Sequence, residues 1–485
     1  MKCGGCALAR QIHKIILRAI VSGTFHIAWK GGYISNLFKN KGDPAVCDNS
    51  RGLLVSDHAG KVLTQLLQDA VHPSYARAVG SQQFGAMPGR GTSLASHCVR
   101  SFLDACRLLR LSVCVILIDL SKAYDLAIRE LLMGWFDQSH MTNIEYLQSL
   151  GIPSEAATAI AEYIDSKGPL FAQLLIDPKV WELIHSLHQG AWFQVPGTDR
   201  FIIPRTGGRQ GCKLAGVIFS MIYSIAMRSL VQHASDLGLV MTLQQSSRQF
   251  WSASKCPPMH EPNYIQASDV EFVDDAALLL SARSPSKLMK AMPKLLSDIL
   301  SVFQRFSFHV NWAKGKTEAF LSLRGKNAHI LMQDTISNES SMLVPNSGER
   351  LRVVSEYKHL GTVLSFDGSD NLDTVRRVQL SLAAYCPLAS KVFGSFSVKI
   401  CLKLKLADSL VFSRLFYNTH LYARLSKFVM AKLNSVYMRV LRKVLGRPPR
   451  FQDRSLNDEQ VRAALHMPCV SLYLGCVVLS IWRRL

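Results

Sequence analysis

Two adjacent carboxylates lie between apolar flanks in the stretch Asp269-Val-Glu-Phe-Val-Asp-Asp-Ala-Ala-Leu-Leu-Leu280. This pattern predicts two short strands joined by a tight turn. Neighbours in a straight strand point to opposite faces, but a turn can bring Asp274 and Asp275 to one side. Asp-Asp pairs are also common in turns for conformational reasons alone. The apolar flanks indicate burial, where an unpaired carboxylate is costly without a cation.

A second strand is predicted at Val113-Cys-Val-Ile-Leu-Ile118, a short apolar and β-branched run that suits burial on both faces of a sheet. Asp119 follows at its end. Carboxylate oxygens are hard ligands that hold Mg²⁺ together with substrate phosphates. Asp119, Asp274 and Asp275 therefore predict a magnesium site. Two ions held there would activate a hydroxyl nucleophile and stabilise a leaving pyrophosphate, as in nucleotidyl transfer.

The charge of the chain is consistent with a nucleic-acid partner. The 485 residues include 56 Lys and Arg against 35 Asp and Glu, which leaves a net charge of +21. A polyanionic partner follows from this excess, although an acidic membrane surface would attract it as well. The length predicts roughly two to four lobes of about 100 to 200 residues each.

We expect an intracellular protein with reduced thiols, without a signal peptide or a transmembrane helix. The twelve cysteines show no regular spacing, and basic residues interrupt the apolar stretch at the N-terminus. The apolar runs Leu214–Met227 and Pro468–Trp482 fall short of the roughly 20 residues that span a bilayer. Both are predicted to be buried helices.

Three further segments indicate secondary structure. Leu214–Leu230 is predicted to be a helix, and the Gly-rich stretch Gly207-Gly-Arg-Gln-Gly211 precedes it. The region from about 244 to 268 has neither a helical nor a strand period and is predicted to be an inserted surface loop. From about Asp373 onward, basic positions among leucines predict a helical lobe that suits a nucleic-acid backbone.

The order of motifs resembles the reverse transcriptases of non-LTR (LINE-type) retrotransposons, from about residue 28 to residue 446. The motifs that carry the resemblance are Phe38-Lys-Asn-Lys-Gly-Asp43, Asn49-Ser-Arg-Gly52, Gln83-Phe-Gly-Ala-Met-Pro-Gly-Arg-Gly91, Ile118-Asp-Leu-Ser-Lys-Ala-Tyr-Asp125, Gly208-Arg-Gln-Gly-Cys-Lys-Leu214, Phe272-Val-Asp-Asp275, Asn311-Trp-Ala-Lys-Gly-Lys-Thr-Glu318 and Tyr357-Lys-His-Leu-Gly361. Two departures are Ala215-Gly216, where the family often has Ser-Pro, and Val273, where a small residue is frequent. Neither departure removes a metal ligand.

The resemblance implies an α+β fold with the right-hand polymerase architecture. Fingers would span 24–110 after an unassigned segment 1–23, and a palm with an antiparallel sheet would span 111–365. Inserted fingers helices would occupy about 130–205, and a helical thumb with the C-terminal region would span 366–485. The chain shows no recognisable endonuclease or RNase H region, so the expectation is a polymerase core.

The resemblance also implies roles for single residues. Asp119, Asp274 and Asp275 would hold two Mg²⁺ ions, with Mn²⁺ as an alternative, and Lys316 would assist the leaving pyrophosphate, with Lys314 as a rival. An aromatic ring at Tyr124 would clash with a 2′-hydroxyl and favour deoxynucleotides. Further nucleotide-binding residues would be Gln210, Gly211, Arg51, Lys39 and Lys41, and primer-binding residues would be Tyr357, Leu360 and Gly361.

The implied function is RNA-directed DNA polymerisation, with an RNA template, a DNA primer and deoxynucleoside triphosphates as partners and no membrane. Nuclear residence is expected from the resemblance, and the oligomeric state stays open. Two alternatives remain. One is an RNA-directed RNA polymerase, which can share the palm carboxylates. The other is a catalytically silent nucleic-acid-binding remnant that keeps its charge and fold.

Overall fold

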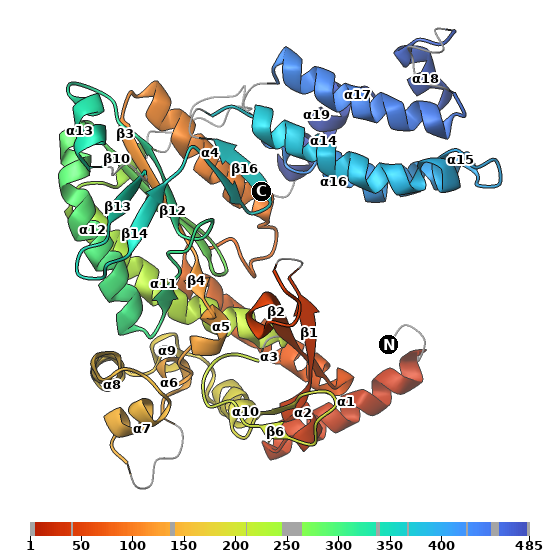
Figure 1. Cartoon of the computed structure of the whole chain (residues 1–485). Helices are drawn as coiled ribbons and strands as arrows, with labels where there is room; N and C mark the ends of the chain where they lie inside the picture. Colours follow the sequence, from red (N-terminus) through yellow and green to blue (C-terminus); the bar gives the residue numbers. More distant parts are fainter. Residues whose placement is uncertain are drawn as a thin grey trace, which may run out of the picture. The chain divides into compact units, whose positions relative to one another are not determined.

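The computed structural model describes residues 5–39, 42–135, 141–209, 211–244, 264–335, 340–365, 368–422, 425–447 and 455–482. Helices and sheets are both present, so the fold is of the α+β type (Figure 1). The chain divides into two compact units. The first contains residues 1–87, 111–319 and 323–352, and the second contains residues 88–110, 320–322 and 353–485.

A six-stranded sheet with the strand order β13-β14-β12-β3-β10-β9 forms the centre of the first unit. Its strands are β3 (Ser112–Ile118), β9 (Asp269–Phe272), β10 (Asp275–Ala282), β12 (Glu318–Ser322), β13 (Ser341–Leu343) and β14 (Arg350–Val353). All seven residues of β3 are buried, as predicted from its apolar run. The hairpin predicted at the Asp-Asp pair is also confirmed, since β9 and β10 pair in antiparallel fashion.

Two long helices cover this sheet. Helix α12 (Pro285–Arg305) packs against β3, β10 and α11 (Lys213–Asp236), and α11 packs against α3 (His58–Val79) (Figure 1). The predicted helix at Leu214–Leu230 is therefore confirmed, and it extends further than its apolar run. Within the described residues α11 is the one helix long and apolar enough to cross a membrane, and 78% of its apolar window is buried in the protein. Such burial is typical of a core helix.

A four-stranded sheet with the order β2-β1-β5-β6 lies at the N-terminal side of the first unit. It contains β1 (Gly31–Phe38), β2 (Ser50–Ser56), β5 (Trp192–Gln194) and β6 (Phe201–Ile202). Further helices of the first unit are α1 (Gly5–Ser22), α2 (Ile27–Lys30), α5 (Ala123–Leu126), α6 (Glu130–Met133), α7 (Asn143–Ser149), α8 (Ser154–Lys167), α9 (Leu170–Gln173) and α10 (Pro178–His188).

The predicted surface loop at about 244–268 is wrong at its C-terminal end. Strands β7 (Met241–Gln244) and β8 (Tyr264–Ala267) pair in antiparallel fashion, so the C-terminal part of the predicted loop is a strand. The alternation in Tyr264-Ile-Gln-Ala267 was too short to reveal it. Residues 245–263 lie outside the described part of the chain. The remaining small elements are β4 (Leu120–Ser121), β11 (His309–Val310) and α13 (Ala328–Thr335).

In its described residues the second unit is mainly helical, and it contains a hairpin formed by β15 (Glu356–His359) and β16 (Thr362–Ser365). Its α-helices are α4 (Thr92–Leu108), α14 (Asn371–Tyr385), α15 (Ile400–Leu406), α16 (Ser413–Leu415), α17 (Lys427–Val444), α18 (Asp458–Ala464) and α19 (Val470–Trp482). Phe393, Phe412 and Tyr437 are fully buried at the centre of a separate hydrophobic core. The predicted helical stretch after about Asp373 is confirmed in the described residues.

Candidate active site

Asp119 is held by the segment that follows β11. Its backbone N–H donates to Thr317 Oγ1 at 3.1 Å, and its carbonyl oxygen accepts from Thr317 Oγ1 at 3.2 Å and from the Asn311 N–H at 2.9 Å. Thr317 is fully buried. Lys316 Nζ reaches Asp119 Oδ1 at 3.2 Å. The Asn311–Glu318 motif therefore surrounds Asp119, with Asn311 and Thr317 fixing its backbone and Lys316 contacting its carboxylate.

The strand register brings Asp275 toward Asp119. Ile118 of β3 is paired with Ala276 of β10, so Asp119 and Asp275 are opposite one another when this antiparallel register is continued by one residue. Opposed residues in an antiparallel pair place their Cβ atoms on the same face. Phe272 pairs with Asp275, which leaves Val273 and Asp274 as the two residues of the hairpin turn.

Electrostatic interactions join the three aspartates. Burial is the largest cause that raises the pKa of Asp274, and the negative charge of Asp119 adds to it. Burial together with the charges of Asp274 and Asp119 raises the pKa of Asp275 to about 6, although the Asp275 side chain still reaches solvent. Lys316 and Arg51 act in the opposite direction. The site is therefore a concentration of negative charge that the protein neutralises only in part.

This arrangement fits a divalent cation in its chemistry. Asp274 and Asp275, whose pKa values are raised by burial and by neighbouring carboxylates, form together with Asp119 a donor set to which a hard cation would bind favourably. Among the described residues, however, no three His, Cys, Asp or Glu side chains lie close enough to hold a metal ion as they stand. The backbone positions bring the three aspartates to one end of the β3–β10 pair, and rotation of their side chains would have to complete a ligand set.

Tyr124 lies beside this acidic group. Its ring stacks on Phe219 of α11, with a centroid distance of 4.9 Å and an angle of 27° between the ring planes. Burial, followed by the charge of Asp274, raises the pKa of Tyr124 well above its ordinary value. The Tyr124 carbonyl oxygen accepts from the Gly208 N–H at 2.8 Å. The Gly-rich stretch therefore holds the backbone of Tyr124 close to the carboxylates.

Several predicted nucleotide-binding residues lie in the first unit. Arg51 on β2 is exposed and lies within electrostatic reach of Asp274 and Asp275. Gly211 has a positive φ of 102°, and a Cβ added to it would come to 2.6 Å from the Leu54 carbonyl oxygen, so only glycine fits here. Lys39 is exposed just beyond the end of β1. Lys41 and Gln210 lie outside the described residues.

The predicted primer-binding residues form the β15–β16 hairpin of the second unit, with Tyr357 on β15 and Leu360-Gly361 at the turn. Both turn residues have positive φ, 46° and 81°, as a type I′ turn requires. The Leu360 carbonyl oxygen accepts from Tyr417 Oη at 3.2 Å, and the Gly361 carbonyl oxygen accepts from Arg376 at 2.9 Å and also from Arg377. The turn is therefore anchored to its own unit through its carbonyl groups.

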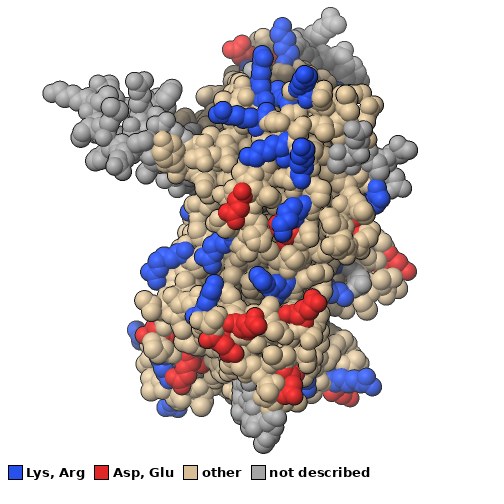
Figure 2. All heavy atoms as spheres, turned by 90° about the vertical axis from the view of Figure 1, so that its left-hand side faces the viewer, with Lys and Arg blue, Asp and Glu red and all other residues tan. Residues whose placement is uncertain are grey.

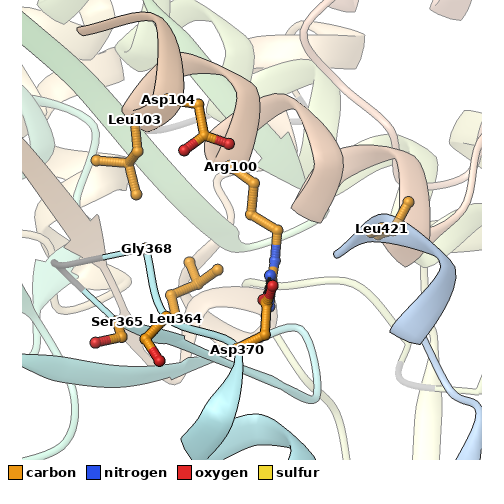
Figure 3. Close-up of a pocket in the computed structure, with 9 residues that line it drawn as sticks. Arg100, Leu103, Asp104, Leu364, Ser365, Gly368, Asp370 and Leu421 are labelled. Carbon is orange, nitrogen blue, oxygen red and sulfur yellow. Dashed lines mark hydrogen bonds and ion pairs between the residues drawn. The ribbon is translucent and has the colours of Figure 1, made fainter. Parts of the chain in front are cut away.

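A small pocket lies near this hairpin within the second unit (Figure 3). Arg100 of α4 and Asp370 point toward each other in it and form an ion pair in which their side chains are 13% and 6% exposed. The residues that line it are Arg100, Leu103, Asp104, Leu364, Ser365, Gly368, Ser369, Asp370 and Leu421. Because Arg100 and Asp370 neutralise each other, the charges in this pocket are explained without a bound ligand.

Sequence reasoning missed the residues that support the predicted ones. Arg376 and Arg377 look like members of a basic helix, and nothing in the local pattern indicates that they hold the Gly361 carbonyl oxygen. Asp373 is fully buried and accepts from Tyr422 Oη at 2.8 Å and from the Val363 N–H at 2.9 Å. Its position in a predicted helix gave no signal for these contacts.

Basic and acidic side chains both lie on the surface. Figure 2 shows Lys and Arg side chains at many places on the face it draws, with Asp and Glu side chains between some of them. The excess of basic side chains, which gives the chain a net charge of +21, is suited to a polyanion.

No protein-family model matches this chain, and no curated protein matches it. Among solved structures, 41 chains match. One of them is apo telomerase from Candida tropicalis, with a TM-score of 0.35 and 13% sequence identity over 90% of this chain and 64% of the telomerase chain. This chain therefore spans less than two thirds of the telomerase chain. A similarity of this degree does not by itself establish a shared fold.

Proposed function

We propose that this chain is the polymerase core of a reverse transcriptase of the non-LTR retrotransposon type. The observation that carries the proposal is the arrangement around Asp119. The carboxylate follows a buried strand, the neighbouring hairpin adds Asp274 and Asp275, and Lys316 contacts it from the motif at 311–318. These residue types in this order are what the resemblance implies for a nucleotidyl-transfer site.

In this proposal Asp119, Asp274 and Asp275 hold two Mg²⁺ ions. Bound there, the ions would supply Lewis-acid stabilisation of the attacking and leaving oxygens during phosphoryl transfer. Thr317 and Asn311 hold the backbone of Asp119, so only its side chain would have to rotate for the carboxylate to serve as a ligand. The raised pKa values of Asp274 and Asp275 mean that these carboxylates gain most from a cation.

The other side chains orient the substrates. Lys316, 42% exposed, is long enough to leave Asp119 and neutralise or protonate a departing pyrophosphate. Arg51 would bind the triphosphate, with Lys39 or Lys41. The Tyr124 ring, supported by Phe219, would lie beneath the incoming sugar and exclude a 2′-hydroxyl. The proposed substrates are a DNA primer, an RNA template and deoxynucleoside triphosphates, and the proposed location is the nucleus.

Primer extension on an RNA template tests the proposal. The unmodified protein with Mg²⁺ is expected to add deoxynucleotides, and Asp274→Asn, which keeps the shape and removes the charge, is expected to abolish extension. Asp236→Asn at the end of α11 is the matched control, because this aspartate accepts a hydrogen bond from Gln232 of its own helix. It should extend primers as well as the unmodified protein.

Three outcomes would contradict parts of the proposal. Equal extension by Asp274→Asn and the unmodified protein would refute the metal site. Preferential incorporation of ribonucleotides would favour an RNA-directed RNA polymerase. A protein that binds nucleic acid but extends no primer would favour the second candidate function, a catalytically silent nucleic-acid-binding protein, which the net charge of +21 supports equally well.

A further inference from the structure

Gln83 is a fully buried side chain that contacts the hairpin carrying Asp274. Its Oε1 accepts from the Val273 N–H at 2.9 Å, and its Nε2 donates to the Val273 carbonyl oxygen at 3.5 Å. Oε1 also accepts from the Gly85 N–H at 2.7 Å, and Nε2 also donates to Glu271 Oε2 at 2.9 Å. Both lone pairs and both N–H groups of this amide are therefore used.

Val273 has a backbone conformation that its side chain disfavours. Its φ is 62°, in the left-handed region, where a β-branched residue is a clear outlier. Such a conformation is strained and persists only where the surroundings enforce it. Val273 directly precedes Asp274, so the same dihedral angles decide where the carboxylate of Asp274 points.

The chain around Gln83 is itself tightly held. Phe84 N–H donates to the Glu271 carbonyl oxygen at 2.8 Å, and Glu271 N–H donates to the Gln82 carbonyl oxygen at 2.9 Å, so the segment extends the edge of β9. Tyr75 Oη of α3 donates to the Gly85 carbonyl oxygen at 2.8 Å. A Cβ added to Gly85 would come to 2.4 Å from Val273 Cγ2, so the side chain of Val273 leaves no room for a side chain at position 85.

We propose that Gln83 is a positioning residue that holds Val273 in its left-handed conformation and thereby sets the direction of the Asp274 carboxylate. The side-chain amide satisfies both backbone groups of Val273, and only an amide offers an acceptor and donors to the same residue in this geometry. The structural part of the proposal is independent of any activity. Its consequence for catalysis rests on the proposed function.

Hydrogen exchange in the purified chain tests the structural part. In Gln83→Met, which keeps length and apolar volume but loses all four hydrogen bonds, the Val273 amide is expected to exchange at least about tenfold faster. Gln82→Met is the matched control, because Gln82 is the adjacent glutamine and its contact with Glu271 runs through its backbone. Unchanged exchange of Val273 in Gln83→Met would overturn the proposal.

A double variant tests whether Gln83 acts through Val273. Glycine adopts positive φ without a steric cost, so Val273→Gly should relieve the need for Gln83. In primer extension, Gln83→Met is expected to lose about tenfold to a hundredfold in kcat, with a smaller change in KM for the nucleotide, and Gln83→Met/Val273→Gly should recover most of that loss. Absence of recovery would show that Gln83 does not act through this turn.

The experiments distinguish a failure of the proposed function from a failure of the role proposed for Gln83. If the unmodified chain extends no primer, the proposed function falls, while the exchange of the Val273 amide still decides the role of Gln83. If Gln83→Met does not fold, the double variant decides, because relief of the strain at Val273 should restore folding. A double variant that also fails to fold would overturn the role assigned to Gln83.

Discussion

Lys316 Nζ lies 3.2 Å from Asp119 Oδ1, although 197 positions separate the two residues. Lys314, two residues earlier in the same motif, is exposed. The sequence alone did not decide which of the two lysines would assist the leaving pyrophosphate. Contact with the carboxylate favours Lys316 as the residue that would neutralise the leaving group.

Replacing each lysine in turn by alanine distinguishes the roles of Lys316 and Lys314. Lys316→Ala is expected to lower the rate of primer extension by about a hundredfold, because general-acid groups contribute on the order of 10²–10⁴. Lys314→Ala is the matched control and should remain within about twofold. Single-turnover extension with saturating nucleotide measures both, and a larger effect from Lys314→Ala would reverse the assignment.

Removal of the Thr317 hydroxyl should destabilise the site. Thr317→Val keeps the shape but leaves the Asp119 N–H without its acceptor, a loss worth about 1–3 kcal/mol for a buried donor. Urea unfolding should show that loss, and extension should slow because Asp119 is no longer fixed. Thr317→Ser keeps the hydroxyl and should lie between Thr317→Val and the unmodified protein. Equal stability of all three proteins would contradict this role.

Tyr124→Ala should weaken sugar discrimination. Without the ring, a 2′-hydroxyl finds space, so the ratio of deoxynucleotide to ribonucleotide kcat/KM should fall by about tenfold or more. Tyr124→Phe keeps the ring and the stacking on Phe219 and should discriminate as the unmodified protein does. Competition between labelled deoxynucleotides and ribonucleotides on one primer gives the ratio. An unchanged ratio in Tyr124→Ala would show that the sugar of the incoming nucleotide does not lie against this ring.

Buried His188 predicts acid sensitivity. Burial is the largest cause that lowers its pKa to about 3, and the charge of Arg209 adds to it. The histidine stays neutral in the folded state but binds a proton in the unfolded state below its ordinary pKa of 6.5. Its contribution to stability is therefore full above pH 6.5 and is lost progressively as pH falls from 6.5 toward 3.

Thermal unfolding between pH 8 and pH 4 tests this expectation. His188→Gln keeps a polar side chain that does not titrate, so the melting temperature should fall less between pH 7 and pH 4 than in the unmodified protein. The exposed His13→Gln serves as control and should follow the unmodified protein. A pH profile that His188→Gln leaves unchanged would exclude this residue as the source.

Nucleic-acid affinity should depend steeply on salt. Lys432 and Arg439 are exposed on α17, and each phosphate contact contributes about one unit to the slope of log affinity against log salt. Replacing both by alanine should lower that slope by about two units. Fluorescence anisotropy with a labelled duplex at several salt concentrations measures it. An unchanged slope would show that this face of α17 does not bind phosphates.

The local sequence pattern was sufficient to predict the strands and the helix that form the site. The apolar run of β3, the hairpin at Asp274 and the core helix α11 follow from side-chain periodicity, because neighbouring residues determine whether a segment can bury one face or all of its faces. The strand β8 was missed because four residues next to a long irregular stretch carry too little periodicity. The positions of Gln210 and Lys41 lie outside the described residues.

The sequence by itself determined the kinds of residue available, namely carboxylates at strand ends, an aromatic ring after Asp119 and a motif with two lysines. Only the tertiary structure decided which of them meet. Gln83 reaches Val273 across 190 positions, and Thr317 reaches Asp119 across 198. Such contacts depend on how β3, β10 and the 311–318 segment pack together, and no local period encodes that packing. The acidic hairpin is thus a property of the sequence, whereas its orientation is a property of the fold.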